Sequence, residues 1–186
     1  MQRTLLEHEM RTENKRVSLY LLSYPDLKKQ WLEYREERLG VLQRPDPADP
    51  MPGHASSRPV SDPTGAAGTA LIAERERFRF SNGDDVLLSL GEVERWLQLC
   101  AEVADRLPWK MQVFLRLRQD TRTCSSRTGG WVPWVQRKYA EEIAKRLGRD
   151  ESDVWIESRH TFYAWWNRIV EYAARMAAKQ GLLDEF

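Results

Sequence analysis

The sequence predicts an all-α fold, and three observations support this prediction. Apolar residues recur at helical spacing through most of the chain. Polar or glycine-containing joints separate these segments, and no alternating stretch of useful length indicates a strand. The 186 residues suffice for one or two domains, because a domain usually holds roughly 100 to 150 residues.

Residues 1–42 form the first predicted region, in which apolar residues at helical spacing lie among many Glu, Lys and Arg residues. Pro25 interrupts the pattern, since proline disfavours the helical conformation of the residue before it and suits the first turn of a new helix. We therefore expect an N-terminal helical pair with a break near Pro25. On its second helix, Leu27, Trp31 and Tyr34 form an apolar stripe typical of a core or a subunit interface.

Residues 43–68 carry six of the nine prolines of the chain, together with Gly, Ala, Ser and Asp. Few of these side chains could bury enough apolar area to offset roughly 1 to 2 kcal/mol of backbone entropy per ordered residue. We expect a flexible proline-rich linker here, followed by a helical domain over residues 69–186. The helices expected at the start of that domain cover about Ala66 to Phe80, Val86 to Arg106 and Trp109 to Gln119, with a turn at Ser81 to Asp85.

The net charge of +1 conceals an uneven distribution along the chain. The segment from Arg106 to Lys179 holds 15 Lys and Arg against 8 Asp and Glu, a net charge of +7. The remainder holds 14 against 20, a net charge of −6. A polyanion such as DNA would bind at the basic end.

A helix-turn-helix is predicted at about residues 134–179. Its first helix includes Tyr139 to Gly148, with Ile143, Ala144 and Leu147 facing inward. Small Ala144 lets the next helix approach closely, and Gly148 supplies the positive backbone angle of a sharp turn. After an acidic connection over residues 149–156, a long helix begins near Ser158 and continues to about Lys179.

The long helix has one apolar and one polar face. The apolar stripe is expected to pack inward and consists of Phe162, Trp166, Ile169, Ala173 and Met176. Arg can bond a guanine edge, Asn an adenine edge and Ala a thymine methyl, while Ser and Thr can bond phosphates. The polar face therefore supplies these candidate DNA-binding residues: Ser158, Arg159, His160, Thr161, Tyr163, Ala164, Asn167 and Arg168. The alternative interpretation is a surface helix with ordinary solvated side chains.

Further cations precede this helix in the sequence. The polar loop over residues 120–133 contains Arg122 and Arg127, which could lie along a phosphate backbone. An ordinary solvated loop is an equally good interpretation. Arg137 and Lys138, at the start of the first helix of the motif, complete the set of candidate phosphate contacts.

Three short motifs, in this order, resemble those of the RinA/ArpU-type phage late-gene transcription regulators. They begin at Tyr24-Pro25-Asp26-Leu27 and at Ser61-Asp62-Pro63-Thr64-Gly65, and the third is the helix-turn-helix with His160-Thr161-Phe162-Tyr163. The resemblance implies a C-terminal module similar to region 4 of sigma factors. It also implies binding to double-stranded promoter DNA of late or packaging genes, with host RNA polymerase as a second partner. Self-association of the chain is left open.

The residues give no indication of an enzyme. His8, His54 and His160 are scattered, and neither Cys100 nor Cys124 has a partner at metal-ligand spacing. No glycine-rich phosphate loop with its lysine is present either. We expect no catalytic residue, no metal site and no cofactor.

Two other functions compete with the regulator. A small terminase subunit would use a similar helix-turn-helix to bind DNA for packaging, and a ring of subunits in solution would favour it. A pure interaction protein would instead bind an acidic partner through the basic C-terminal region, without the steep salt dependence of DNA binding. The N-terminus lacks an apolar signal region and no apolar run approaches the roughly 20 residues of a membrane span, so we expect a cytoplasmic protein.

Overall fold

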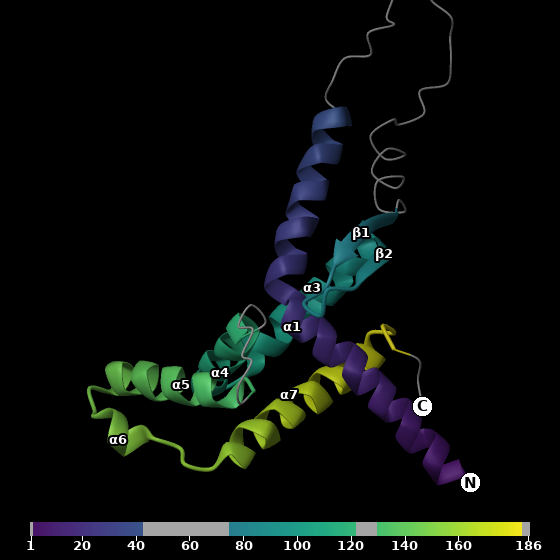
Figure 1. Cartoon of the computed structure of the whole chain (residues 1–186). Helices are drawn as coiled ribbons and strands as arrows, with labels where there is room; N and C mark the ends of the chain where they lie inside the picture. Colours follow the sequence, from purple (N-terminus) through teal and green to yellow (C-terminus); the bar gives the residue numbers. More distant parts are fainter. Residues whose placement is uncertain (1, 43–74, 122–129, 184–186) are drawn as a thin grey trace, which may run out of the picture.

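Helices dominate the fold, as predicted, but a two-stranded hairpin accompanies them. The computed structural model describes residues 2–42, 75–121 and 130–183 (Figure 1). The elements, in chain order, are α1 (Gln2–Leu42), β1 (Arg75–Arg79), β2 (Asp85–Ser89), α3 (Leu90–Arg106), α4 (Trp109–Asp120), α5 (Val132–Leu147), α6 (Glu151–Val154) and α7 (Arg159–Lys179). The proline-rich linker expected at residues 43–68 lies outside the described residues. None of the described helices is both long and apolar enough to cross a membrane.

The expected break at Pro25 is wrong, because α1 continues through this residue as one helix. Proline has no N–H, so the carbonyl of Leu21, four residues earlier, loses its helical donor. The side-chain amide of Gln119, on α4, donates a hydrogen bond to that carbonyl at 2.8 Å. Gln119 is only 8% exposed, and this contact satisfies a carbonyl that would otherwise be buried without a partner.

The helix expected over residues 66–80 is wrong for residues 75–80, where the structure describes them. The helix expected from Val86 to Arg106 is confirmed over Leu90–Arg106, but its first four residues are strand. Residues 75–79 and 85–89 instead pair as antiparallel strands, and α3 begins only at Leu90. Residues 80–84 close the hairpin: the N–H of Phe80 donates to the carbonyl of Asp84 at 2.9 Å, and Gly83 has a φ of 90°. Such a three-residue turn with a left-handed glycine is common in hairpins.

Side chains of α1 cover the outer edge of β1. The Gln30 amide donates to the Arg79 carbonyl at 2.9 Å and accepts from the Arg79 N–H at 2.8 Å. The Tyr34 hydroxyl donates to the Arg77 carbonyl at 2.8 Å. The hairpin is therefore fixed to α1 by hydrogen bonds that replace those of a third strand.

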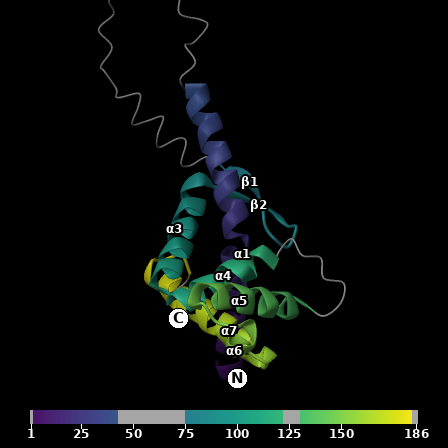
Figure 2. The ribbon, with the colours of Figure 1, turned by 90° about the vertical axis from the view of Figure 1, so that its left-hand side faces the viewer.

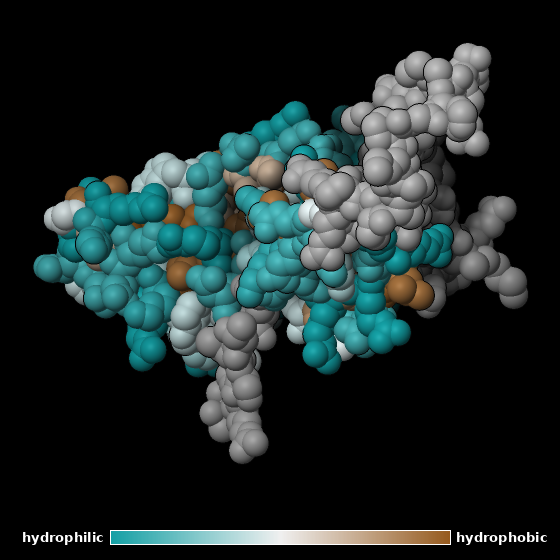
Figure 3. Space-filling view, turned by 90° about the horizontal axis from the view of Figure 1, so that it is seen from above, coloured by the Kyte–Doolittle hydropathy of each residue, from teal (hydrophilic) through white to brown (hydrophobic). Residues whose placement is uncertain are grey.

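One hydrophobic core joins α1 to the helices that follow the hairpin. Tyr20 of α1 stacks on Trp96 of α3, with ring centroids 4.0 Å apart, and contacts Phe80 edge to face. α1 also packs against α4 and α7, and it crosses the other elements in both ribbon views (Figures 1 and 2). Seen from above, hydrophilic residues cover most of the coloured surface and apolar ones form small patches (Figure 3).

Candidate nucleic-acid interface

The segment predicted as a helix-turn-helix consists of α5, a left-handed glycine, the short α6 and the long α7. α5 starts at Val132, earlier than the stretch whose amphipathic pattern was recognised, and Pro133 occupies its first turn. It ends at Gly148, which has a φ of 62° and whose N–H bonds the Ala144 carbonyl. The predicted turn glycine is confirmed, and the acidic connection contains one additional turn of helix, Glu151–Val154.

The apolar stripe of α7 packs inward as predicted, since all five of its residues are buried: Phe162, Trp166, Ile169, Ala173 and Met176. The ring centroid of Phe162 lies 5.9 Å from those of Phe114 on α4 and Tyr139 on α5. Trp165 contacts the same two rings, at 5.6 and 5.5 Å. These four aromatic rings fix the rotation of α7 about its axis.

The opposite face of α7 lies on the molecular surface. Seven of the eight residues predicted there are exposed, namely Ser158, Arg159, His160, Tyr163, Ala164, Asn167 and Arg168. The eighth, Thr161, is half-buried, and its N–H bonds the Ser158 carbonyl at 3.1 Å. Within the described part of the chain, the side chains of Arg159, Asn167 and Arg168 form no hydrogen bond or ion pair. Their polar groups are thus available to a ligand.

Gln136 connects α5 to the start of α7. Its side chain is 7% exposed, and its amide donates to the carbonyl of Ile156 at 2.6 Å and more weakly to that of Glu157 at 3.5 Å. This hydrogen bond fixes the irregular segment that leads into α7 to α5. This contact could not be predicted from the sequence, because Gln136 has the pattern of an ordinary polar residue on a helix surface.

Arg118 is a second residue that sequence reasoning missed. Its guanidinium lies 4.3 Å from the ring centroid of Trp131 and 5.2 Å from that of Trp166, and it donates to the Thr121 hydroxyl at 2.7 Å. Burial lowers the pKa of the guanidinium to about 10. Trp131 in turn contacts Tyr163 at 5.3 Å, so the described ends of the predicted basic loop lie beside the exposed face of α7.

Of the remaining predicted cations, only Arg137 and Lys138 lie among the described residues, and their surroundings differ. Arg122 and Arg127 lie outside the described residues. Arg137 is exposed on α5, whereas Lys138 is half-buried and donates to a carboxylate oxygen of Glu141 at 2.7 Å. This bond lowers the pKa of Glu141 and offsets the charge of Lys138.

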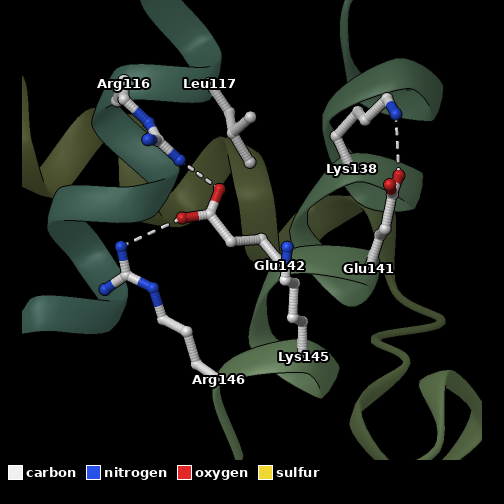
Figure 4. Close-up of a pocket in the computed structure, with 7 residues that line it drawn as sticks. All are labelled: Arg116, Leu117, Lys138, Glu141, Glu142, Lys145 and Arg146. Carbon is white, nitrogen blue, oxygen red and sulfur yellow. Dashed lines mark hydrogen bonds and ion pairs between the residues drawn. The ribbon is translucent and has the colours of Figure 1, made fainter.

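Lys138 belongs instead to a pocket between α4 and α5 (Figure 4). Glu142 lies at its centre and forms ion pairs with Arg116 of α4 and Arg146 of α5. Four cations, Arg116, Lys138, Lys145 and Arg146, line the pocket with two carboxylates, so a net charge of +2 remains after the ion pairs are counted.

Acidic side chains lie near the start of α7, where Asp150, Glu151, Asp153 and Glu157 are exposed. They repel phosphates, while Arg159 and Arg168 attract them. The exposed surface at the start of α7 therefore carries charges of both signs.

Comparisons with known proteins give no independent assignment: no protein-family model, no curated protein and no solved structure matches the chain.

Proposed function

We propose that this protein is a sequence-specific DNA-binding transcription regulator and that the N-terminal half of α7 enters the major groove. The observation that carries the proposal is the division of α7 into two faces. Its apolar stripe is held by the aromatic rings of α4 and α5, while Arg159, Tyr163 and Asn167 face outward. A rigid helix with a free polar face can be positioned against base edges without reorganisation.

The spacing of the outward residues fits a groove. Arg159, Tyr163 and Asn167 are four residues apart, so they follow one side of the helix over about 12 Å at 1.5 Å per residue. The major groove is about 12 Å wide and admits an α-helix, whose diameter with side chains is about 10 to 12 Å. Arg159 would bond a guanine, Asn167 an adenine, and Ala164 would contact a thymine methyl.

Phosphate contacts orient such a helix on the duplex. The first amides of α7 have no intrahelical partner, and the helix dipole makes this end favourable for a phosphate. Arg168 at the margin and Arg137 on α5 are both exposed and supply further contacts. Each phosphate that these cations neutralise adds about −0.9 to the log-log slope of affinity against salt, so the measured slope reports the number of phosphate contacts.

The biological assignment rests on the resemblance of the sequence motifs to phage late-gene regulators. By this assignment the protein acts in the cytoplasm of a bacterial host, binds promoters of late or packaging genes and influences host RNA polymerase there. The exposed polar face of α7 supports the DNA-binding part of this proposal, because a regulator must distinguish its promoter from other DNA.

Selection of bound fragments from a random duplex pool tests the proposal. The expected result is that one sequence is enriched. The affinity of the protein for a duplex with this sequence should fall as the salt concentration rises. The enriched sequence should map upstream of late or packaging genes in a phage genome, and the protein should change transcription from that promoter by purified polymerase. A pool without enrichment would remove sequence-specific reading from the account.

A further inference from the structure

Among the described residues, α1 bonds the outer edge of β1, whereas no other element bonds the outward groups of Asp85 and Leu87 on β2. Backbone groups of an antiparallel strand point alternately toward and away from the partner strand. The Phe80 N–H donates to the Asp84 carbonyl. Every second pair along the ladder from this one, such as Phe78 with Val86, therefore directs its backbone N–H and carbonyl groups to the partner strand within the hairpin. The backbone groups of Asp85 and Leu87 therefore point to the outer edge of β2, as does the N–H of Ser89, whose carbonyl belongs to the N-cap of α3.

The two outer edges of the hairpin differ in their hydrogen bonds to the rest of the described structure. Gln30 and Tyr34 of α1 bond the outward groups of β1. For the outward groups of Asp85 and Leu87, no hydrogen bond to another element exists among the described residues. An uncovered strand edge is a template for pairing with another strand.

The side chains of β2 also favour pairing. Leu87 is 57% exposed and Val86 is 38% exposed, and the strand contains no lysine or proline of the kind that blocks edge pairing. Asp85 is its one charged residue, and it lies at the end of the strand. The centre of the edge is thus both unpaired and apolar.

We propose that β2 pairs with β2 of a second copy of this chain, antiparallel and with Leu87 on the twofold axis. In this register Leu87 faces Leu87 of the second copy, and each Asp85 faces a Ser89. All five residues of the strand are used, and no two like charges face each other. A shift by two residues in either direction would leave part of each strand unpaired.

The strand is therefore complementary to itself, which is what a twofold interface requires. Pairing turns two hairpins into a four-stranded sheet, a more stable unit than an isolated hairpin. A contact between two five-residue strands is small, so the dimer is expected to be weak and to dissociate on dilution.

The dimer leaves the exposed face of α7 free in both copies. The hairpin lies beside α1, whereas α6 and the start of α7 lie at a different end of the molecule (Figures 1 and 2). The proposal goes beyond DNA binding and does not depend on it, because the pairing is measured without DNA.

Sedimentation of the full chain over a concentration series tests the dimer. The wild-type protein should shift from monomer to dimer as its concentration rises, and Leu87→Lys should stay monomeric because it places a charge on the axis. Leu39→Lys is the matched control, since it adds the same charge to a leucine of α1 that is 42% exposed. A wild-type protein that stays monomeric, or a dimer that Leu39→Lys disrupts and Leu87→Lys does not, would overturn the proposal.

Cross-linking tests the register and does not depend on the lysine variants. In a Cys124→Ser background, with the native Cys100 buried, Leu87→Cys should form a disulfide-linked dimer under mild oxidation. Directly opposed residues lie about 5.5 Å apart between Cα atoms, within the range of a disulfide. Val86→Cys should cross-link poorly, because its counterpart lies diagonally across the pair, at about 7 to 8 Å. Preferential cross-linking through Val86→Cys would contradict the axis at Leu87.

Discussion

The side-chain amide of Gln119 donates a hydrogen bond of 2.8 Å to the carbonyl of Leu21, although the two residues are 98 positions apart in the sequence. That carbonyl lacks its helical donor because Pro25 has no N–H. The contact therefore explains how α1 continues through a proline, and it also ties α4, which supports α7 through Phe114, to the longest helix of the molecule.

Replacing Gln119 with leucine should lower the free energy of unfolding by about 1 to 3 kcal/mol, because a buried carbonyl is left without a partner. In a Pro25→Ala background the helix can supply its own N–H to Leu21, so the same replacement should cost about 1 kcal/mol less. Urea denaturation of the four proteins in this cycle measures the difference. Equal costs in both backgrounds would show that Gln119 acts independently of the proline. Gln112→Ala is the control: its amide also bonds a carbonyl, that of Leu107, but in an exposed position, so its loss should cost less than about 1 kcal/mol.

Gln136→Leu tests the connection between α5 and α7. Loss of the bond to the Ile156 carbonyl should destabilise the first turn of α7 by about 1 to 3 kcal/mol. Amide hydrogen exchange at residues 159–163 should become faster, whereas exchange in the middle of α1 should not change. If α7 reads DNA, affinity should fall while the preference for the selected sequence is kept, because every outward side chain remains. Unchanged exchange at the start of α7 would remove this positioning role.

Because the Tyr139 hydroxyl is buried, we expect the free energy of unfolding to decrease in alkaline solution. Burial raises the pKa of this hydroxyl from 10.0 to about 12 in the folded protein. Between these values the unfolded chain releases the proton and the folded protein keeps it, so stability present below pH 10 is lost as the pH rises toward 12.

Comparison with Tyr139→Phe isolates this contribution. Other groups, including Arg118, whose lowered pKa acts in the opposite direction, are common to both proteins. The difference in unfolding free energy, wild type minus Tyr139→Phe, should decrease from pH 9 to pH 12. A constant difference over that range would show that the hydroxyl titrates alike in both states.

The long amphipathic helices could be predicted from the sequence because their apolar periodicity reflects burial directly. The stripe of α7 and the turn at Gly148 are confirmed for this reason. The break at Pro25 was a sound local inference that a contact from α4 overrides, and a partner so distant in the sequence leaves no local signal.

The hairpin could have been recognised. Phe78 and Phe80 alternate with arginines, and Asn82-Gly83 is a strong turn signal between two apolar stretches. The alternation is short, and Val86 to Ser89 continue directly into α3, so the helical pattern concealed the strand. At the candidate site, the supporting roles of Gln136 and Arg118 depend on which elements pack together, which periodicity does not determine.

The most direct test of the central claim measures specificity in three arginine and asparagine variants of α7. Affinities of Arg159→Ala, Asn167→Ala and the wild type are compared for the selected duplex and for random duplex of equal length. Arg175→Ala is the matched control, because it lies on the same helix, is exposed and is outside the proposed contact.

Each of the first two variants should lose about 5- to 150-fold in preference for the selected duplex, corresponding to the roughly 1 to 3 kcal/mol of one base contact. Arg175→Ala should keep the wild-type preference. Losses of equal size on both duplexes, or no loss at all, would contradict base reading by α7.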